Sequence, residues 1–173
     1  MSCNHQIPIV YFDLETSGLS PKTEDIIQIG AIKNDYAFEQ IVFSHKNNIF
    51  RNIDPSMGIA LSSALRLFEK FVGPNKAILV SHSGTSFDER FIKAAYQKIR
   101  KPMPPNFIFV DSASYCKNTL GCRKYSISFL ADKLNIPFST SRAHTALYDT
   151  KILKKICQKI GLEKNFQLAE LTN

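Results

Sequence analysis

Two carboxylates near the N-terminus, Asp13 and Glu15, are separated by a single residue. They follow an apolar run from Ile7 to Phe12, which predicts a buried strand. On an extended backbone, residues i and i+2 point to the same face, roughly 6–7 Å apart. Two acids on one face at the end of a core strand repel each other and lose hydration energy. A bound cation would remove both penalties, although a pair of solvated acids in a turn is an alternative that this stretch alone leaves open.

Three residues further along the chain could join these acids. Asp88 lies at the predicted start of a helix, where its alternative role is a carboxylate stabilised by the helix dipole. Asp149 follows His144 by five residues, which would place the two side chains about 140° apart on an ideal helix at ~100° per residue. If they act together, His144 must lie on the loop or first turn while Asp149 lies on the helix. A surface role for this His–Asp pair is the alternative.

The chemistry of such a cluster would be hydrolysis of a phosphodiester. Four carboxylates balance the charge of two Mg²⁺ ions, which prefer oxygen ligands. Two such ions ~3.5–4 Å apart can clamp the attacking and the leaving oxygen of a phosphodiester. A histidine can deprotonate the attacking water near neutral pH, and basic residues can hold the nucleic-acid backbone.

The elements that must position these residues follow from the hydrophobic periodicity. The pattern predicts strands over 7–12, 25–33, 37–44, 77–80 and 107–110, and helices over 57–72, 87–100, 126–134 and from 141–144 to 160. Short connections make the first three strands antiparallel, and helical crossovers add the others, which gives an α/β fold with a mixed five-stranded sheet flanked by helices. Ligands on such sheets gather at strand ends. Asp111, after the fifth strand, is interpreted as a helix cap.

Composition and charge agree with one nucleic-acid-binding domain over residues 1–173, with its core over about 7–160. Residues 1–87 carry 7 Lys/Arg against 8 Asp/Glu, whereas residues 88–173 carry 15 against 7. This basic half favours a polyanion, although Lys151, Lys154, Lys155 and Lys159 also suit an exposed helix face. The four cysteines form no Cys-x-x-Cys pair, which predicts reduced thiols and an intracellular protein, cytoplasmic or nuclear. We expect no membrane span and no signal peptide.

Three stretches together resemble the motifs of a known family. They are Phe12-Asp-Leu-Glu-Thr-Ser-Gly-Leu19, His82-Ser-Gly-Thr-Ser-Phe-Asp88 and Ala143-His-Thr-Ala-Leu-Tyr-Asp149. In order and spacing they are similar to the exonuclease motifs of the DEDDh (DnaQ-like) 3′→5′ exonucleases, and within these to the three-prime repair exonuclease branch. The resemblance covers residues 7 to about 160.

The resemblance implies an RNase H-like fold and a two-metal reaction that releases nucleoside 5′-monophosphates from 3′ ends of single-stranded DNA or RNA. It implies that Asp13, Glu15, Asp88 and Asp149 are ligands of two Mg²⁺ ions, with Mn²⁺ as an alternative, and that His144 is the general base. It also implies substrate contacts from Thr16, Gly18, Leu19, His82 and Ser83, with Leu19 against the last base. The family usually has His-Asn where this chain has His82-Ser83, so the grip on substrate is expected to differ.

Two other functions are compatible with the same fold. One is a catalytically silent protein that binds nucleic acid or a protein partner, and the other is an RNase H-like endonuclease. Relatives in the resembling branch often dimerise through an edge strand, for which residues 37–44 are the candidate here.

Overall fold

The computed structural model describes residues 6–46, 53–83 and 85–170. Cys3 lies outside these ranges, and so does Gly84, which belongs to the second motif. Its strands are β1 (Ile9–Thr16), β2 (Ile26–Lys33), β3 (Tyr36–Ile41), β4 (Ala77–Ser81) and β5 (Phe107–Asp111). Its helices are the short 3-10 helix η1 (Pro55–Met57), α1 (Leu61–Val72), α2 (Phe87–Lys98), α3 (Ser112–Leu120), α4 (Ile127–Lys133), α5 (Ala146–Lys159) and α6 (Glu163–Glu170).

The strands form one sheet in the order β3-β2-β1-β4-β5. β1, β2 and β3 are antiparallel neighbours, whereas β4 and β5 join parallel to β1 through helical crossovers. The predicted mixed five-stranded sheet is therefore confirmed. β3 lies at one edge of the sheet, as a strand available to a second copy would; dimerisation itself stays a prediction.

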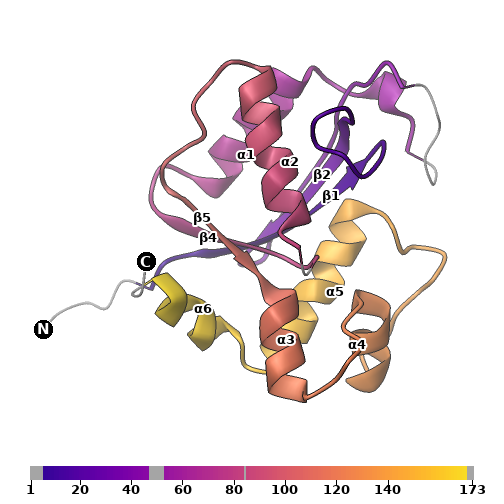
Figure 1. Cartoon of the computed structure of the whole chain (residues 1–173), viewed down its shortest axis with the longest axis vertical. Coiled ribbons are helices and arrows are strands. Elements are labelled where there is room, and N and C mark those ends of the chain that lie inside the picture. Colours follow the sequence, from indigo (N-terminus) through magenta and orange to yellow (C-terminus); the bar gives the residue numbers. More distant parts are fainter. Residues whose placement is uncertain (1–5, 47–52, 84, 171–173) are drawn as a thin grey trace, which may run out of the picture.

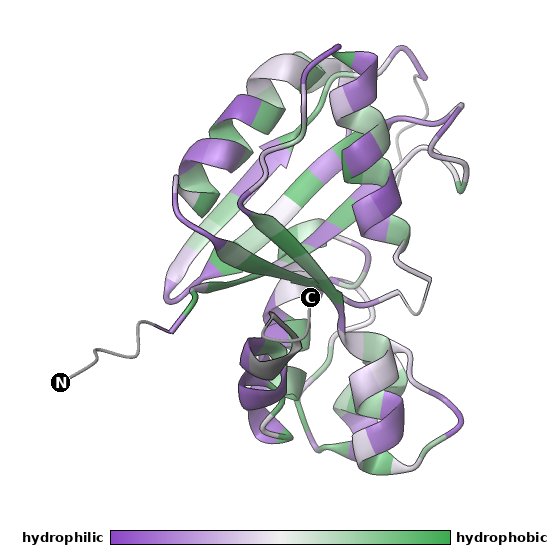
Figure 2. Cartoon of the chain, turned by 60° about the vertical axis from the view of Figure 1, so that its left-hand side comes forward, coloured by the Kyte–Doolittle hydropathy of each residue, from purple (hydrophilic) through white to green (hydrophobic). Residues whose placement is uncertain are grey.

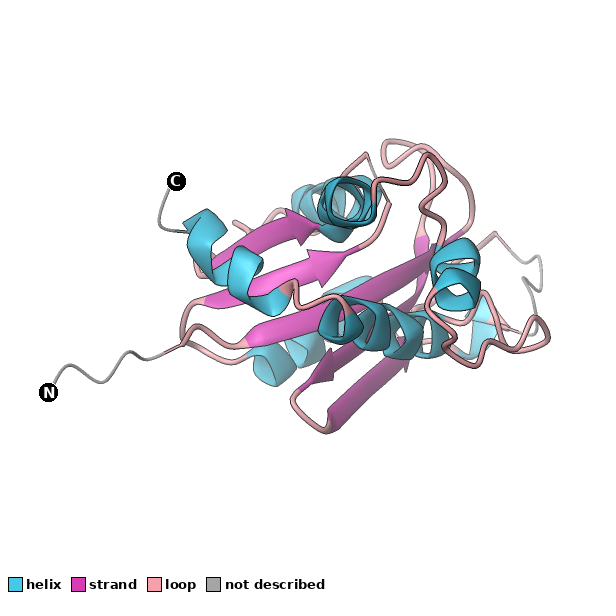
Figure 3. Cartoon of the chain, turned by 90° about the horizontal axis from the view of Figure 1, so that it is seen from below, coloured by secondary structure: helices cyan, strands magenta, loops and turns pink. Residues whose placement is uncertain are grey.

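Helices cover both faces of the sheet, α1 and α2 on one side and α3 to α6 on the other (Figures 1 and 3). Alternate residues of β1 enter the two cores: Phe12 and Leu14 pack with α1 and α2, whereas Tyr11 packs with α5 and α6. In Figure 2 some strands are hydrophobic along their length and others are mixed, while the helices carry both hydrophobic and hydrophilic residues. None of the described helices is long and apolar enough to cross a membrane.

Several predicted boundaries were wrong, and one helix was missed. β3 ends at Ile41 and not at residue 44, and α1 begins at Leu61 and not at residue 57. β1 runs on to Thr16 because β2 pairs with it along its whole length, so Asp13 and Glu15 lie within the strand and not after it. α5 begins at Ala146, because the preceding His144 has a left-handed backbone that cannot continue a helix. α6 was not predicted; it folds back so that Phe166 is buried in the core beside α5.

Candidate active site

Asp13 and Glu15 project from the face of β1 that α5 covers. They continue the row begun by Tyr11, because residues two apart in a strand share a face. Their partners on β2 are Gly30 opposite Asp13 and Gln28 opposite Glu15. The two acids therefore lie beside the two residues of β2 that contact the start of α5.

Gln28 and Gly30 fix the N-terminus of α5 against the sheet. The buried Gln28 side chain accepts a hydrogen bond from the Ala146 backbone N–H through Oε1 at 2.9 Å. A Cβ at position 30 would lie 2.3 Å from backbone atoms of Ala146 and Leu147, so the helix approaches this closely only because residue 30 is glycine. Thr150 Oγ1 lies 3.3 Å from the Gly30 carbonyl oxygen. These contacts bring Asp149, in the first turn of α5, over the acids of β1.

Sequence reasoning missed Gln28, Gly30 and Thr150, although Gly30 and Gln28 each interrupt an apolar strand. Gly30 interrupts an otherwise apolar strand, and a glycine inside a strand often marks the close approach of another backbone. The buried polar Gln28 in the same strand was a second clue, because a buried amide needs partners.

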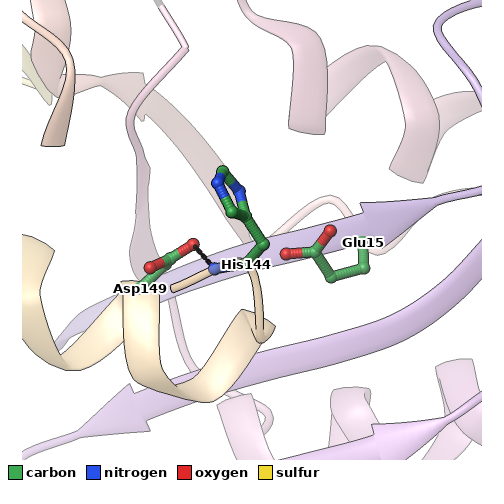
Figure 4. Close-up of side chains that lie close together, drawn as sticks. All are labelled: Glu15, His144 and Asp149. Carbon is green, nitrogen blue, oxygen red and sulfur yellow. Dashed lines mark hydrogen bonds between the residues drawn. The ribbon is translucent and has the colours of Figure 1, made fainter. Parts of the chain in front are cut away.

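His144 precedes α5 and lies over the same acids (Figure 4). Its backbone has φ +64°, an uncommon conformation for a residue with a side chain. The Asp149 carboxylate holds it there by accepting a hydrogen bond from the His144 backbone N–H at 2.9 Å. One ligand atom from each of Glu15, His144 and Asp149 lies within 4.8 Å of the others. The expected position of His144, on the loop ahead of the helix, is confirmed.

Asp88 comes from α2, which covers the face of the sheet opposite to α5. It lies in the first turn of α2 and is 3% exposed, where the Leu14 backbone and the Ser81 side chain donate hydrogen bonds to it. Burial raises its pKa to about 7. Burial also raises the pKa of Asp13 well above its usual range, with further contributions from Asp88, Glu15 and Asp149. Asp13 is thus close enough to each of the other three acids to be repelled by its charge.

This arrangement is costly for the protein alone and suits a divalent cation. Burial and the charges of the neighbouring acids make it costly for the Asp13 carboxyl to be ionised. Oxygen-rich sites with several carboxylates are the kind that Mg²⁺, Ca²⁺ and Mn²⁺ occupy. Glu15, His144 and Asp149 bring their ligand atoms together and could hold such an ion, and the neighbouring Asp13 and Asp88 could add carboxylate oxygens.

Asp111, at the end of β5, organises the segment that leads into Asp88. Its carboxylate accepts hydrogen bonds from Ser83 N at 3.2 Å, Ser83 Oγ at 2.9 Å and Ser86 N at 2.9 Å. It also caps α3 by accepting from Ala113 N at 3.1 Å, which confirms the predicted cap. Ser83 Oγ in turn accepts from Phe87 N at 2.8 Å, so the predicted substrate residue Ser83 has a structural role.

Replacing Asp111 with alanine is expected to lower the free energy of unfolding by about 2 kcal/mol, because a helix cap and charge-assisted hydrogen bonds are lost together. The amides of Ser83 and Ser86 should also exchange faster with solvent. Thermal unfolding and hydrogen exchange measure the two effects. Asp132→Ala, at an exposed position of α4, is the control. Unchanged exchange at Ser83 and Ser86 would contradict the proposed organisation.

His82, which follows β4, forms hydrogen bonds with two other segments of the chain. Its Nε2 donates to the Tyr125 carbonyl oxygen at 2.5 Å, and its Nδ1 lies 2.9 Å from Ser112 Oγ. Burial lowers the pKa of His82, against the opposing influence of the Tyr125 hydrogen bond and the charge of Asp111. Both ring nitrogens therefore have protein partners, and substrate contact by His82 stays a prediction.

The turn after β1 is held by polar contacts and presents one apolar side chain. Thr16 Oγ1 donates to the Gly18 carbonyl oxygen at 2.7 Å. A Cβ on Gly18 would lie 2.9 Å from the Glu24 side chain, so a larger residue would displace that side chain. Leu19 is 84% exposed. Thr16, Gly18 and Leu19 thus form a rigid turn with Leu19 at its surface, as a residue that packs against a ligand would be.

A cleft of about 780 Å³ opens beside the acids. Asp149, His144, His82 and Ser83 lie along it, and its other walls come from the segment 124–128 and from residues 138–143. Its size suits a nucleotide or a few nucleotides more than a single ion.

Comparisons with known proteins agree with this geometry. The family model of the RNase H superfamily matches residues 10–146. Ribonuclease T of Citrobacter koseri is 30% identical over 173 aligned residues, which cover 82% of this chain and 79% of that protein. The PolC-type DNA polymerase III of Mycoplasma genitalium is 29% identical over 85% of this chain, and the chain spans only 11% of the length of that protein.

Solved structures show the same fold. The nuclease domain of 3'hExo, a DEDDh family member bound to rAMP, has a TM-score of 0.76 at 16% identity, with 95% of each chain covered. An E. coli ExoI–ssDNA complex has a TM-score of 0.77 at 14% identity, over 97% of this chain and 43% of that one. The family model covers most of the chain, and Ribonuclease T reaches 30% identity over most of both proteins. The chain therefore belongs to the RNase H superfamily.

Proposed function

We propose that this protein is a 3′→5′ exonuclease that removes nucleoside 5′-monophosphates from the 3′ ends of single-stranded DNA or RNA. The observation that carries the proposal is the cluster of Glu15, His144 and Asp149 beside a cleft of about 780 Å³. The charges of Asp88, Glu15 and Asp149 all act on Asp13, which supports a role for the four acids together. Ribonuclease T and the ExoI–ssDNA complex add support, since one name denotes a ribonuclease and the other structure contains single-stranded DNA.

The four carboxylates would hold the metal, which we propose to be two Mg²⁺ ions, with Mn²⁺ as a substitute. Mg²⁺ is favoured because the proposed ligands are carboxylate oxygens, and Mg²⁺ usually combines one or two carboxylates with water and substrate phosphate. When bound, such ions supply positive charge that stabilises the charge developing on the phosphate oxygens. Asp149 would also position the base, because it holds the backbone of His144.

His144 would accept the proton of the attacking water. Its side chain is exposed at the rim of the cluster, where water and a phosphate can reach it. Leu19 would pack against the last base, and Thr16 and Gly18 would shape the turn beneath the last nucleotide. Basic side chains of the second half of the chain would hold the strand.

The described residues form one sheet with its flanking helices, which supports a single exonuclease domain over residues 1–173. The chain covers most of Ribonuclease T but about a tenth of the PolC-type polymerase, so the larger assembly in which it acts is part of the proposal. An intracellular location, cytoplasmic or nuclear, and a homodimer through β3 also remain predictions.

The direct test is digestion of matched DNA and RNA oligonucleotides of one sequence, labelled at the 5′ end, with Mg²⁺ and with EDTA. We expect a ladder that shortens from the 3′ end and free 5′-monophosphates with Mg²⁺, and no products with EDTA. A circular single strand should stay intact. Cleavage of the circle would favour the endonuclease, and the absence of any Mg²⁺-dependent product from either oligonucleotide would favour the silent binding protein.

His144→Asn is expected to lower kcat by about 10²–10⁴-fold, the usual contribution of a general base. Asparagine tolerates the left-handed backbone at position 144, so the fold should be kept. His45→Asn, at an exposed histidine of another segment, is the control. Initial rates and thermal unfolding report the two properties. A variant that retained normal turnover would remove His144 from the mechanism.

A further inference from the structure

A second cavity, lined by basic and aromatic side chains, lies behind the wall of the catalytic cleft. It measures about 500 Å³ and lies between the segment 137–142 and one face of α5. Its cationic residues are Arg142, Lys151 and Lys155, and none of the residues that line it is acidic. We call it the Arg142–Lys155 groove.

The wall of this groove is held in place by Tyr148. The Tyr148 hydroxyl accepts a hydrogen bond from Ser139 N at 2.6 Å. The Arg142 guanidinium carbon lies 5.1 Å from the centre of the Tyr148 ring, and the Phe138 ring packs 5.9 Å from it. The groove is therefore preformed, with a cation stacked on an aromatic ring at its edge.

Two of the cations, Lys151 and Lys155, remain available to a ligand, while Arg142 is stacked on Tyr148. Lys151 and Lys155 are exposed, and among the described residues neither makes a recorded ion pair. Lys154, on the next face of α5, differs: it bonds the Asn34 carbonyl oxygen and lies 3.9 Å from Asp35. Lys151 and Lys155 are one helical turn apart, about 6 Å along the axis, so each can meet a separate phosphate of an extended strand.

The groove adjoins the catalytic cleft. Phe138 lines both, while Thr140 and Ala143 of the same segment face the cleft and Ser139 and Arg142 line the groove. A strand whose 3′ end lies at the acids could thus cross this segment and continue along α5 (the upper right of the lower helices in Figure 1). Positive charge combined with aromatic surface is the usual composition of single-strand sites.

We propose that the Arg142–Lys155 groove binds the phosphodiester backbone of the single-stranded substrate on the 5′ side of the nucleotides held in the catalytic cleft. This inference rests on the proposed exonuclease function and assigns the path of the strand outside the cleft. The site should raise affinity for long substrates without taking part in the hydrolytic step.

The test compares Lys151→Ala/Lys155→Ala with Lys159→Ala/Lys164→Ala, which removes the same charge from exposed positions outside the groove. Binding of a 5′-fluorescein-labelled 16-nucleotide oligothymidylate is measured by anisotropy in EDTA at several salt concentrations. For the groove variant we expect a Kd about tenfold higher than that of the unmodified protein. The slope of log K against log salt should also be shallower by about 1.4, at ~0.7 per phosphate contact on a single strand. For the control variant we expect a Kd within about twofold of the unmodified protein.

Hydrolysis of the 4-nitrophenyl ester of thymidine 5′-monophosphate, with Mg²⁺, separates this proposal from the proposed function. The ester is too short to reach the groove, so both double variants should hydrolyse it at the unmodified rate. Equal losses of affinity in the two double variants, or no loss in the groove variant, would contradict the proposal that the groove binds the substrate backbone. The protein could instead show groove-dependent binding and hydrolyse neither the ester nor an oligonucleotide. That result would support strand binding by the groove and contradict the proposed exonuclease activity.

Discussion

Replacing Asp13 with asparagine is expected to lower kcat by about 10³-fold, roughly 4 kcal/mol of lost transition-state stabilisation. Asparagine keeps the shape of the side chain but not its charge, so the metal site loses a ligand while β1 and its pairing with β2 are preserved. Initial rates at saturating Mg²⁺ with a labelled oligonucleotide measure the change.

The same substitution should make the metal-free protein more stable. In the absence of a cation, Asp13 is repelled by Asp88, Glu15 and Asp149 and has lost its hydration, which together raise its pKa. Removing about 1 kcal/mol of this repulsion would raise Tm by roughly 2–4 °C for a chain of this size. Thermal unfolding in EDTA measures it.

The gain in stability should depend on pH with a definite sign. The carboxyls of Asp13 and Asp88 have pKa values in the folded protein above the ordinary value of 3.8, about 7 for Asp88. At pH values between 3.8 and these raised pKa values, the folded chain binds more protons than the unfolded chain. The free energy of unfolding therefore falls as pH rises through this window. The advantage of Asp13→Asn in EDTA should therefore be present near pH 7.5 and vanish at pH ~2.5, where the carboxyl is protonated in both the folded and the unfolded state.

Two controls accompany this experiment. Asp35→Asn removes a fully exposed carboxylate and should change neither rate nor Tm appreciably. Saturating Mg²⁺ should reverse the order of stability, because the unmodified protein gains binding energy that the variant has largely lost. An Asp13→Asn protein that turned over normally, or that melted earlier than the unmodified protein in EDTA, would show that these acids do not form a metal centre.

Replacing Gly30 with alanine is expected to displace the start of α5, and thereby to abolish activity without touching any proposed ligand. The added methyl group would lie 2.3 Å from backbone atoms of Ala146 and Leu147, and a backbone cannot move aside as a side chain tip can. We expect a loss of about 3 kcal/mol in the free energy of unfolding and at least about 10²-fold in kcat, since a displacement of roughly 1 Å can cost that much.

Gly121→Ala is the matched control for Gly30→Ala. Gly121 has φ +58°, so alanine there costs backbone strain, but its methyl group would meet nothing within 4 Å. It should lower Tm slightly and leave kcat unchanged. Denaturant unfolding and initial rates distinguish the two variants. If Gly30→Ala kept both its stability and its rate, the position of Asp149 would not depend on this contact.

Much of the architecture could be predicted from the sequence because its signals are local. The apolar run over residues 25–33 placed β2, the glycine and proline turns separated the strands, and the short connections made the first three antiparallel. The boundaries that failed depended on distant partners: β1 is extended to Thr16 by β2, and α6 is stabilised by its packing beside α5.

The sequence by itself determined which residues can do the chemistry, because residue type and motif spacing are properties of the chain. Asp13, Glu15, Asp88, His144 and Asp149 were all identified from it. Only the tertiary structure decided that they meet, since the meeting depends on contacts between segments more than a hundred residues apart. Gln28 and Gly30 on β2 receive α5 and so bring Asp149 to β1, and the Asp149 carboxylate holds His144 in place. Such contacts are made by packing and by backbone hydrogen bonds, which no local pattern of residue types specifies.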